Sequence, residues 1–340
     1  MAHQAHHEAV EALPPTLFLT DADVGAASDW AAAASALRAA YRAPHDEAMV
    51  PPRAMARADG RWLRTLSAAS PSGGHMGAKL ICASTRNRKA SYLVALFEQE
   101  SCRLRALIDG NRVTALRTAA TSAVAIDALA PQRPLKVALL GSGFEAHGQL
   151  HALAALRRIE SVKVYSPTPA NRQRFADDNG RALDLQVQAL DSAREAVRGA
   201  DVVICAARSR DESPALLGEW LEPGMTVVSI GSTLPEQREV DTEAIRRAGV
   251  IVADMVHEVA DDTGDMLAAT REQVPFREKI HSLAELLRAP QAVRAAGDIA
   301  LYKSVGSALQ DVVVAEMLLE RALQLGLGTP LPVTIAPVGK

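Results

Sequence analysis

Hydrophobic and polar positions follow different patterns in the two halves of the chain. Between residues 61 and 110, short β-rich runs such as "RWLRTLSAAS", "GAKLICAS" and "SYLVALFEQES" are separated by clusters of Pro, Gly, Ser and Asn. This pattern is typical of an antiparallel or mixed sheet, and Glu98 to Ser101 fits a hairpin turn. Upstream, "TLFLT" predicts a strand, and "DWAAAASALRAAY" predicts an amphipathic helix capped by Ser28. The first part of the chain is therefore expected to form an α+β domain.

From Thr114 onwards, strand patterns and helix patterns alternate. "TALRTAATSAVAIDALA" predicts a helix that Thr114 caps and Pro131 ends. Apolar strands such as "KVALLG", "ADVVICAA" and "MTVVSIG" follow, with helical segments between them. Apolar strands that alternate with helices are typical of a parallel sheet covered on both faces. The predicted fold class is therefore α/β, with a Rossmann doubly wound parallel sheet after the N-terminal α+β domain.

The last part of the chain, "DIALYKSVGSALQDVVVAEMLLERALQLGLG", predicts one long helix led in by Lys303 and Ser304. Its apolar face can pack on the first domain or on a second subunit. We therefore predict a substrate-binding and dimerisation domain over residues 1–115. A Rossmann dinucleotide-binding domain follows over residues 116–304, and residues 305–340 contribute the C-terminal helix that completes the first domain.

The stretch "KVALLGSGFEAHGQL" contains the pattern G-x-G-x-x-A directly after a strand and before a helix. In this pattern Gly141 permits the tight turn, Gly143 lets the backbone approach a pyrophosphate, and Ala146 lets the helix pack closely on the strand. The free N–H groups at the helix start favour an anion. The residues expected to bind the cofactor here are Gly141, Ser142, Gly143, Phe144, Glu145 and Ala146.

The end of the second strand in this domain indicates which dinucleotide is preferred. NAD-selective sites normally have Asp or Glu there, which binds the ribose hydroxyls and repels a 2′-phosphate. Here the sequence reads "YSPTPANR", in which Ser166 and Thr168 can donate to a phosphate and Arg172 can pair with it. We expect NADP(H) to be preferred and NAD(H) to be possible, a solvated surface role being the alternative for Arg172. The remaining expected cofactor contacts are Thr118, Ala206 and Gly231.

Composition excludes several partners. A formal net charge of −3 provides no basic surface for nucleic acid or an acidic membrane. No run approaches the ~20 apolar residues of a membrane helix, and the first residues lack the pattern of a secretory signal. A cytoplasmic location is therefore expected.

Cysteines and N-terminal histidines predict neither a disulfide nor a metal site. The cysteines are Cys82, Cys102 and Cys205. They lack CxxC spacing, so we expect buried free thiols in a reducing compartment. His3, His6 and His7 share no fixed element, so we expect no metal there.

Five sequence blocks resemble the successive signatures of a known family. These blocks are "GAKL", "LIDGNRVTALRTAATSAVA", "LLGSGFEAHGQLHAL", "GSTLPEQREVD" and "LYKSVGSALQD". In this order, and over nearly the full length, they are similar to the ornithine cyclodeaminase and mu-crystallin family. The resemblance implies a homodimer built through the N-terminal domain, and hydride transfer at the α-carbon of an amino acid or its imine.

Such a substrate carries a carboxylate beside the reacting carbon. A carboxylate in a water-poor cleft needs charge-assisted donors, and a guanidinium is the best of these. Arg53, Lys79 and Arg117 are basic residues among apolar or small neighbours. The resemblance implies that these positions bind the substrate carboxylate, whereas a surface charge is the alternative for Arg53 and Lys79.

One position departs from the cyclodeaminases of the family. They have an acidic residue two places before the proline of the "GSTLP" block, and this chain has Thr233 there. A hydroxyl cannot replace a carboxylate as a general base near neutral pH. In the resembled family, the mu-crystallin branch acts as a ketimine reductase and likewise has a small hydroxyl residue at the position of Thr233. Glu239 and Asp241 follow, and we expect them to cap the next helix.

We therefore expect an NADPH-dependent reductase of a cyclic or linear α-imino acid, with Δ1-pyrroline-2-carboxylate or its six-membered homologue as the leading candidates. Lys79, Arg117 and Thr233 form the expected catalytic set, in which Thr233 orients the imine nitrogen. The alternatives are an ornithine cyclodeaminase or amino acid dehydrogenase, and a non-catalytic protein that binds NADPH and a small ligand. His75 is either a proton donor or a solvated loop residue.

Overall fold

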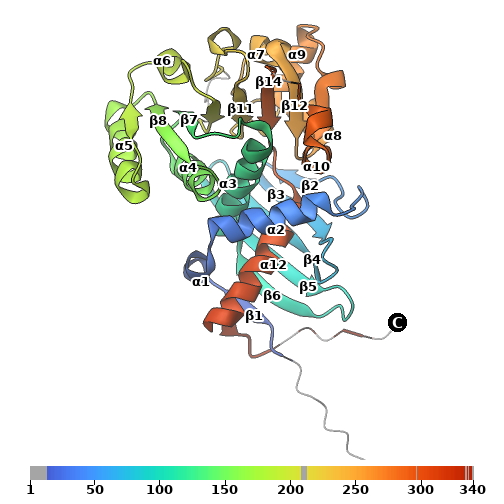
Figure 1. The fold of residues 1–340 in the computed structure, drawn as a ribbon. Helices are drawn as coiled ribbons and strands as arrows, with labels where there is room; N and C mark the ends of the chain where they lie inside the picture. Colours follow the sequence, from blue (N-terminus) through green and yellow to red (C-terminus); the bar gives the residue numbers. More distant parts are fainter. Residues whose placement is uncertain (1–13, 208–212, 296, 334, 336, 339–340) are drawn as a thin grey trace, which may run out of the picture.

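Two β-sheets organise the chain in a computed structural model, which describes residues 14–207, 213–295, 297–333, 335 and 337–338 (Figure 1). The first is a seven-stranded sheet with the order β15-β1-β6-β5-β4-β3-β2. The second is an eight-stranded sheet with the order β13-β12-β14-β11-β10-β7-β8-β9. The predicted α/β class with a doubly wound parallel sheet is confirmed, while His3, His6 and His7 lie outside the described residues.

The strands of the first sheet are β1 (Leu17–Leu19), β2 (Ala54–Ala58), β3 (Arg61–Ala69), β4 (His75–Ser84), β5 (Lys89–Glu98), β6 (Leu104–Asp109) and β15 (Thr329–Pro330). Those of the second are β7 (Leu135–Leu140), β8 (Ile159–Tyr165), β9 (Val187–Ala189), β10 (Val202–Cys205), β11 (Thr226–Ser229), β12 (Ala248–Ala253), β13 (Ile280–Ser282) and β14 (Ile299–Lys303). The α-helices are α1 (Asp21–Ala27), α2 (Trp30–Arg42), α3 (Gly110–Leu129), α4 (Phe144–Leu156), α5 (Pro169–Leu183), α6 (Ala193–Val197), α7 (Thr242–Arg247), α8 (Val256–Asp262), α9 (Gly264–Arg271), α10 (Leu283–Arg288), α11 (Pro290–Val293) and α12 (Ala308–Leu325), and the short 3-10 helices are η1 (Gly218–Trp220) and η2 (Arg277–Lys279).

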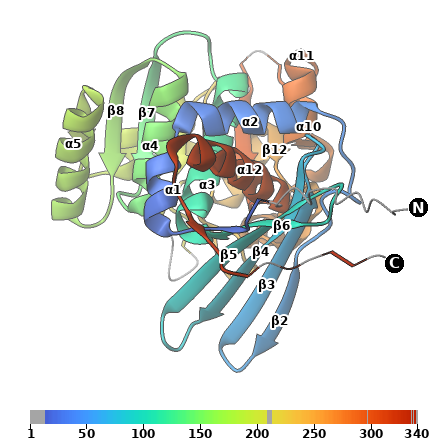
Figure 2. The same cartoon turned by 90° about the horizontal axis from the view of Figure 1, so that it is seen from below.

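Long antiparallel strands form the centre of the first sheet. The pairing places Leu66 of β3 opposite Lys79 of β4, and Lys79 opposite Val94 of β5. Because side chains alternate between the faces of a sheet, these three residues share one face. Helix α12 contacts β3, β4 and β5, and Figure 2 shows it lying over this sheet. Lys79 is consequently held between the sheet and α12 and is only 1% exposed.

The strands of the second sheet pair in parallel throughout. Its central strands β7, β10, β11, β12 and β14 are buried almost entirely, as expected of a sheet with helices on both faces. In a sheet of this type, ligands bind outside the carboxyl ends of the strands. The residues just after β7, β10, β11, β12 and β14 are therefore the first place to look for a site.

The C-terminal run contains a strand that the sequence pattern did not separate from the helix led in by Lys303 and Ser304. Residues Ile299–Lys303 form β14, which lies between β11 and β12, and the helix proper begins only at Ala308. "IALYK" is a short apolar run, and such runs fit a buried strand and a buried helix equally well. Gly306, at φ +80°, takes the left-handed conformation that separates the strand from the helix.

Two predicted helix caps are also wrong. Helix α3 begins at Gly110, where the Asp109 carboxylate accepts the N–H of Asn111, and it crosses the predicted boundary at residue 115. Thr114 instead donates its hydroxyl to the Gly110 carbonyl at 2.8 Å. Helix α2 is capped by Asp29, because Ser28 ends a short preceding helix, α1, that the pattern did not reveal.

The cysteine prediction is wrong for two of three residues. Cys205 is buried in β10, but Cys82 and Cys102 are exposed, and all three are free thiols. Cys82 lies on the opposite face of β4 from Lys79 because it is an odd number of residues away. No helix in the described part of the chain is long and apolar enough to cross a membrane.

Candidate active site

The glycine loop after β7 has the geometry of a pyrophosphate site. Gly141 has φ +119°, and a Cβ atom there would lie 2.5 Å from the carbonyl oxygen of Ala206, so only glycine fits. Gly143 is the N-cap of α4, and a Cβ atom there would meet nothing within 4 Å. Ala146 is fully buried against the sheet, whereas Phe144 is 63% exposed. The loop therefore leaves open space at the N-terminus of α4, where the helix dipole favours an anionic group.

The residues after β8 form a connected polar set. The hydroxyl of Ser142 lies 2.8 Å from that of Ser166, which joins the glycine loop to the end of β8. Arg172 is buried; it donates to the Ser166 carbonyl at 2.9 Å and forms a close ion pair with the exposed carboxylate of Asp191. Thr168 is exposed at the start of α5. The sequence did not reveal that Asp191 would pair with this guanidinium.

The other expected cofactor residues lie at the carboxyl ends of β10 and β11 and on α3. Ala206 follows β10, and Gly231 follows β11. Thr118 lies one residue beyond Arg117 on α3, and its hydroxyl donates to the Thr114 carbonyl at 2.7 Å. Helix α3 contacts both β11 and β14, so it connects the ends of the parallel sheet to the basic residues of the first sheet.

Glu239 is not the helix cap that the sequence predicted. Asp241 caps α7 as expected, but the Glu239 carboxylate is fully buried and accepts the N–H groups of Ala207 at 3.1 Å and Gly231 at 2.8 Å. It also accepts the hydroxyl of Ser229 at 2.7 Å. Burial raises the pKa of Glu239 to about 7. This carboxylate therefore fixes the two loops that follow β10 and β11.

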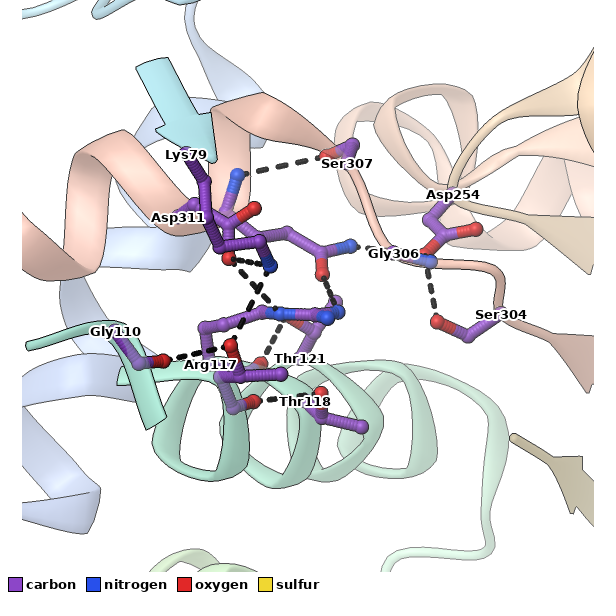
Figure 3. A network of polar contacts seen from close by, with 12 residues as sticks. Lys79, Gly110, Arg117, Thr118, Thr121, Asp254, Ser304, Gly306, Ser307 and Asp311 are labelled. Carbon is purple, nitrogen blue, oxygen red and sulfur yellow. Dashed lines mark hydrogen bonds and ion pairs between the residues drawn. The ribbon is translucent and has the colours of Figure 1, made fainter. Parts of the chain in front are cut away.

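A buried cluster joins Lys79, Arg117 and Asp311, and Figure 3 shows both cations pointing toward the carboxylate. Lys79 Nζ lies 2.7 Å from Asp311 Oδ1, and Arg117 Nε lies 3.1 Å from the same oxygen. Arg117 also donates to Gln310 Oε1 at 2.9 Å. The pKa of Lys79 is lowered to about 8, mainly by burial; Asp311 opposes this shift, and the charge of Arg117 acts in the same direction as burial. Two cations thus share one carboxylate, which leaves positive charge for a ligand.

The linker between β14 and α12 lies against this cluster. Asp254, just after β12, accepts the hydroxyl of Ser304 at 2.6 Å and the N–H group of Gly306 at 2.8 Å (Figure 3). It also accepts the N–H group of Val305 at 3.0 Å. A Cβ atom on Gly306 would collide with the guanidinium of Arg117. The linker is therefore fastened at the carboxyl edge of the parallel sheet and supports Arg117 from one side.

Arg53 reaches the same region but has its own counterion. Its guanidinium forms a close ion pair with Glu258 of α8, and its backbone N–H donates to the other oxygen of that carboxylate at 3.1 Å. The pKa of Arg53 is lowered to about 10, mainly by burial, and the charge of Arg64 acts in the same direction. The structure thus brings Lys79 and Arg117 together through Asp311 and holds Arg53 separately.

Thr233 and His75 lie outside this cluster of ion pairs. Thr233 is half-buried in the loop after β11, where its N–H donates to Gln237 Oε1 at 3.1 Å. His75 Nδ1 lies 3.0 Å from Glu316 Oε1, and that carboxylate also accepts the hydroxyls of Ser70 and Ser72. His75 is therefore not the solvated loop residue of the second alternative, because it fastens the loop between β3 and β4 to α12.

The sequence and the fold of the chain are similar to those of known imine-reducing enzymes. The model of the ornithine cyclodeaminase/mu-crystallin family matches residues 15–326. The Delta(1)-pyrroline-2-carboxylate reductase of Bacillus cereus is 29% identical over 260 residues, covering 74% of this chain and 79% of that protein. The ketimine reductase mu-crystallin of Mus musculus is 30% identical over 224 residues, covering 66% of this chain and 67% of that one. The structure of the Thermococcus litoralis Delta(1)-pyrroline-2-carboxylate reductase in complex with NADH and L-proline superimposes with a TM-score of 0.84 at 27% identity, covering 93% of this chain and all (100%) of that one.

Proposed function

Because the chain belongs to the ornithine cyclodeaminase/mu-crystallin family, we propose that it is an NAD(P)H-dependent oxidoreductase that reduces the C=N bond of an α-imino acid to give the L-amino acid. Cyclic ketimines such as Δ1-pyrroline-2-carboxylate or Δ1-piperideine-2-carboxylate, and linear imino acids, belong to this substrate class. The observation that carries the proposal is the buried pair of Lys79 and Arg117, which share the single carboxylate of Asp311 beside the nucleotide-binding edge of the parallel sheet.

In this proposal Lys79 and Arg117 bind the substrate carboxylate, and Asp311 and Gln310 hold the two cations in place. The cluster is closed to water on most sides, so each charge-assisted hydrogen bond is stronger than at a surface. Arg53 reinforces the positive field from its position on Glu258. Thr233 orients the imine nitrogen through its hydroxyl, and the chain has no carboxylate at that position to activate an amine or water.

A nicotinamide dinucleotide fits the residues at the strand ends. The open space at Gly143 and the N-terminus of α4 suit its pyrophosphate, and Glu239 holds the loops of Ala206 and Gly231 for the nicotinamide end. When bound, the reduced nicotinamide supplies the hydride that a protonated imine accepts at its α-carbon. We include a preference for NADP(H) in the proposal, because Ser166, Thr168 and Arg172 lie together with no carboxylate at the end of β8 itself.

The proposal extends to a homodimer in the cytoplasm. Strand β2 is the edge of the first sheet, and most of its residues are exposed, so its free backbone groups can pair with a second copy. The exposed free thiols of Cys82 and Cys102 are typical of a reducing compartment. Size-exclusion chromatography with light scattering measures the molar mass in solution and so tests the homodimer.

The experiment is a panel of cyclic and linear imino acids, formed in place from keto acids and amines, and assayed with NADPH and NADH in parallel. Oxidation of the cofactor with any imino acid is the expected result, and chiral analysis identifies the L-product. Ammonia release from ornithine with NAD⁺, without imine reduction, would instead identify a cyclodeaminase. Cofactor binding without turnover of any imino acid would identify a binding protein.

A further inference from the structure

A fourth cation, Arg64, lies close enough to the cluster to act on Lys79, and no described residue forms an ion pair with it. Arg64 is on β3 opposite Ile81 of β4, two residues along from Lys79, so both cations project from the same face of the sheet. Diagonal neighbours of this kind are about 7–8 Å apart, within reach of long side chains. Arg64 and Lys79 can therefore contact a single small molecule from two directions.

The charge of Arg64 is partly buried and has no ion-pair partner among the described residues. The side chain is half-buried, and its Nε atom is fully enclosed with no hydrogen-bond partner among the described residues. The guanidinium carbon lies 5.1 Å from the centre of the Trp62 ring. Burial lowers the pKa of Arg64, and the charges of Arg57 and Arg117 act in the same direction. A desolvated cation in this state favours an anionic partner.

Three carboxylates of the cluster and its neighbourhood are engaged by other groups. Asp311 is shared by Lys79 and Arg117, and Glu258 pairs with Arg53. Asp254 accepts from the linker before α12 and from Gln310. Within the part of the chain that the structure describes, no carboxylate lies within ion-pair distance of Arg64. One α-carboxylate bound by Lys79 and Arg117 also leaves the charge of Arg64 unmatched.

We propose that Arg64 determines substrate specificity by binding a second carboxylate on the side chain of the imino acid, so that the preferred substrates are short dicarboxylic α-imino acids. The inference rests on the proposed function and narrows its substrate class. Lys79 and Arg117 hold the α-carboxylate, and the Arg64 guanidinium receives the distal one in bidentate fashion. Trp62 supports the guanidinium plane and limits the length of the side chain that fits.

The test compares matched substrates in wild-type protein and three variants. The imines that ammonia forms with oxaloacetate and 2-oxoglutarate are assayed beside those from pyruvate and 2-oxobutanoate. We expect the wild type to prefer the dicarboxylic imines in kcat/KM, and Arg64→Gln to lower that preference by about 10- to 100-fold, mainly through KM, because a hydrogen-bonded charge is lost. Arg64→Lys should restore part of the preference. Arg61→Gln is the matched control, because Arg61 is exposed on the same strand but on the opposite face from Arg64, and it should leave the preference unchanged.

Each other outcome separates the inference from the proposed function. Imine reduction without a dicarboxylic preference, or an equal loss for both substrate types in Arg64→Gln, overturns the role of Arg64 and leaves the proposed function intact. If no imine is reduced, calorimetry decides the inference on its own: succinate should bind more tightly than butanoate to the wild type with NADP⁺ present. Equal binding of the two acids, or binding that Arg64→Gln does not weaken, overturns it. Circular dichroism and melting temperature verify that each variant is folded.

Discussion

Replacing Asp311 by Asn should move the pH range over which the protein captures its substrate. Lys79 binds the substrate carboxylate only as an ammonium ion, and burial has already lowered its pKa to about 8. The wild-type kcat/KM, which reports on the free enzyme, should therefore decline as the pH rises above about 8. The Asp311 carboxylate, 2.7 Å from Lys79 Nζ, opposes the effect of burial, and Asn removes that opposition.

The size of the change follows from the contact. An opposite charge at this range raises the pKa of a cation by about 1–3 units, so the Lys79 pKa should fall to roughly 5–7 in Asp311→Asn. With a shift of about 2 units, only about a tenth of the molecules keep the ammonium ion at pH 7, and kcat/KM falls roughly 10-fold there. At pH 5.5 much of the loss should be recovered, which a simple loss of folding would not produce.

The assay is the initial rate of NADPH oxidation between pH 5.5 and 10, at saturating cofactor and with the imine concentration measured at each pH. Glu316→Gln is the control, because Glu316 lies on the same helix but contacts His75. The kcat/KM of this variant should still decline near pH 8. If kcat/KM of Asp311→Asn declined over the same pH range as that of the wild type, the reasoning would be refuted. Stability should change with pH in the opposite direction to kcat/KM. Because the pKa of Lys79 in the folded protein is below its ordinary value of 10.5, the free energy of unfolding should rise with pH between about 8 and 10.5.

Three further predictions concern other parts of the site. Arg172→Ala should raise the KM for NADPH about 10-fold with little change for NADH, and equal changes for both cofactors would remove Arg172 from phosphate binding. Gly306→Ala should lower kcat/KM through collision with Arg117, whereas Gly224→Ala, at a similar φ of +85° with no atom within 4 Å of the new Cβ, should destabilise the protein by about 1–3 kcal/mol without that loss of activity. Glu239 has a pKa raised from 4.5 to about 7, so the stability that its protonated form contributes is lost as the pH rises across this window; Glu239→Gln should abolish that decline in melting temperatures measured from pH 5 to 8.

The features predicted best from the sequence depend on local patterns. The glycine loop could be predicted because Gly141 and Gly143 lie between an apolar strand and a helix. The structure confirms the tight turn at Gly141 and the open space at Gly143. The resemblance pointed to Lys79 and Arg117, and the structure brings them together. The prediction was wrong where the hydrophobic pattern did not distinguish a strand from a helix. The run "IALYK" fits a buried strand and a buried helix equally well, so β14 was not separated from the helix that follows it.

The partners of the basic residues could not be predicted, because they come from distant elements. Asp311 lies 232 positions from Lys79 in the sequence. The sequence does contain one indication of this partner. An aspartate among the apolar residues of "LQDVVV" indicates a buried carboxylate, whose burial is costly unless a cation pairs with it. Arg64 carries no such signal, because an arginine in an alternating strand is normally assigned to the solvent face. Glu239 was assigned to a cap by its position before α7, although only the fold shows that its carboxylate turns inward.

The placement of β14 has a consequence for how the chain folds during synthesis. The parallel sheet is divided between β11 and β12 until residues Ile299–Lys303 are inserted, so the ribosome must release nearly the whole chain before that sheet is continuous. The next segment, α12, then delivers Asp311 to cations that were made more than 190 residues earlier. Assembly of both sheets and neutralisation of the buried charges thus coincide in the last step, and a nascent chain that stalls before residue 299 exposes an unfinished sheet to aggregation.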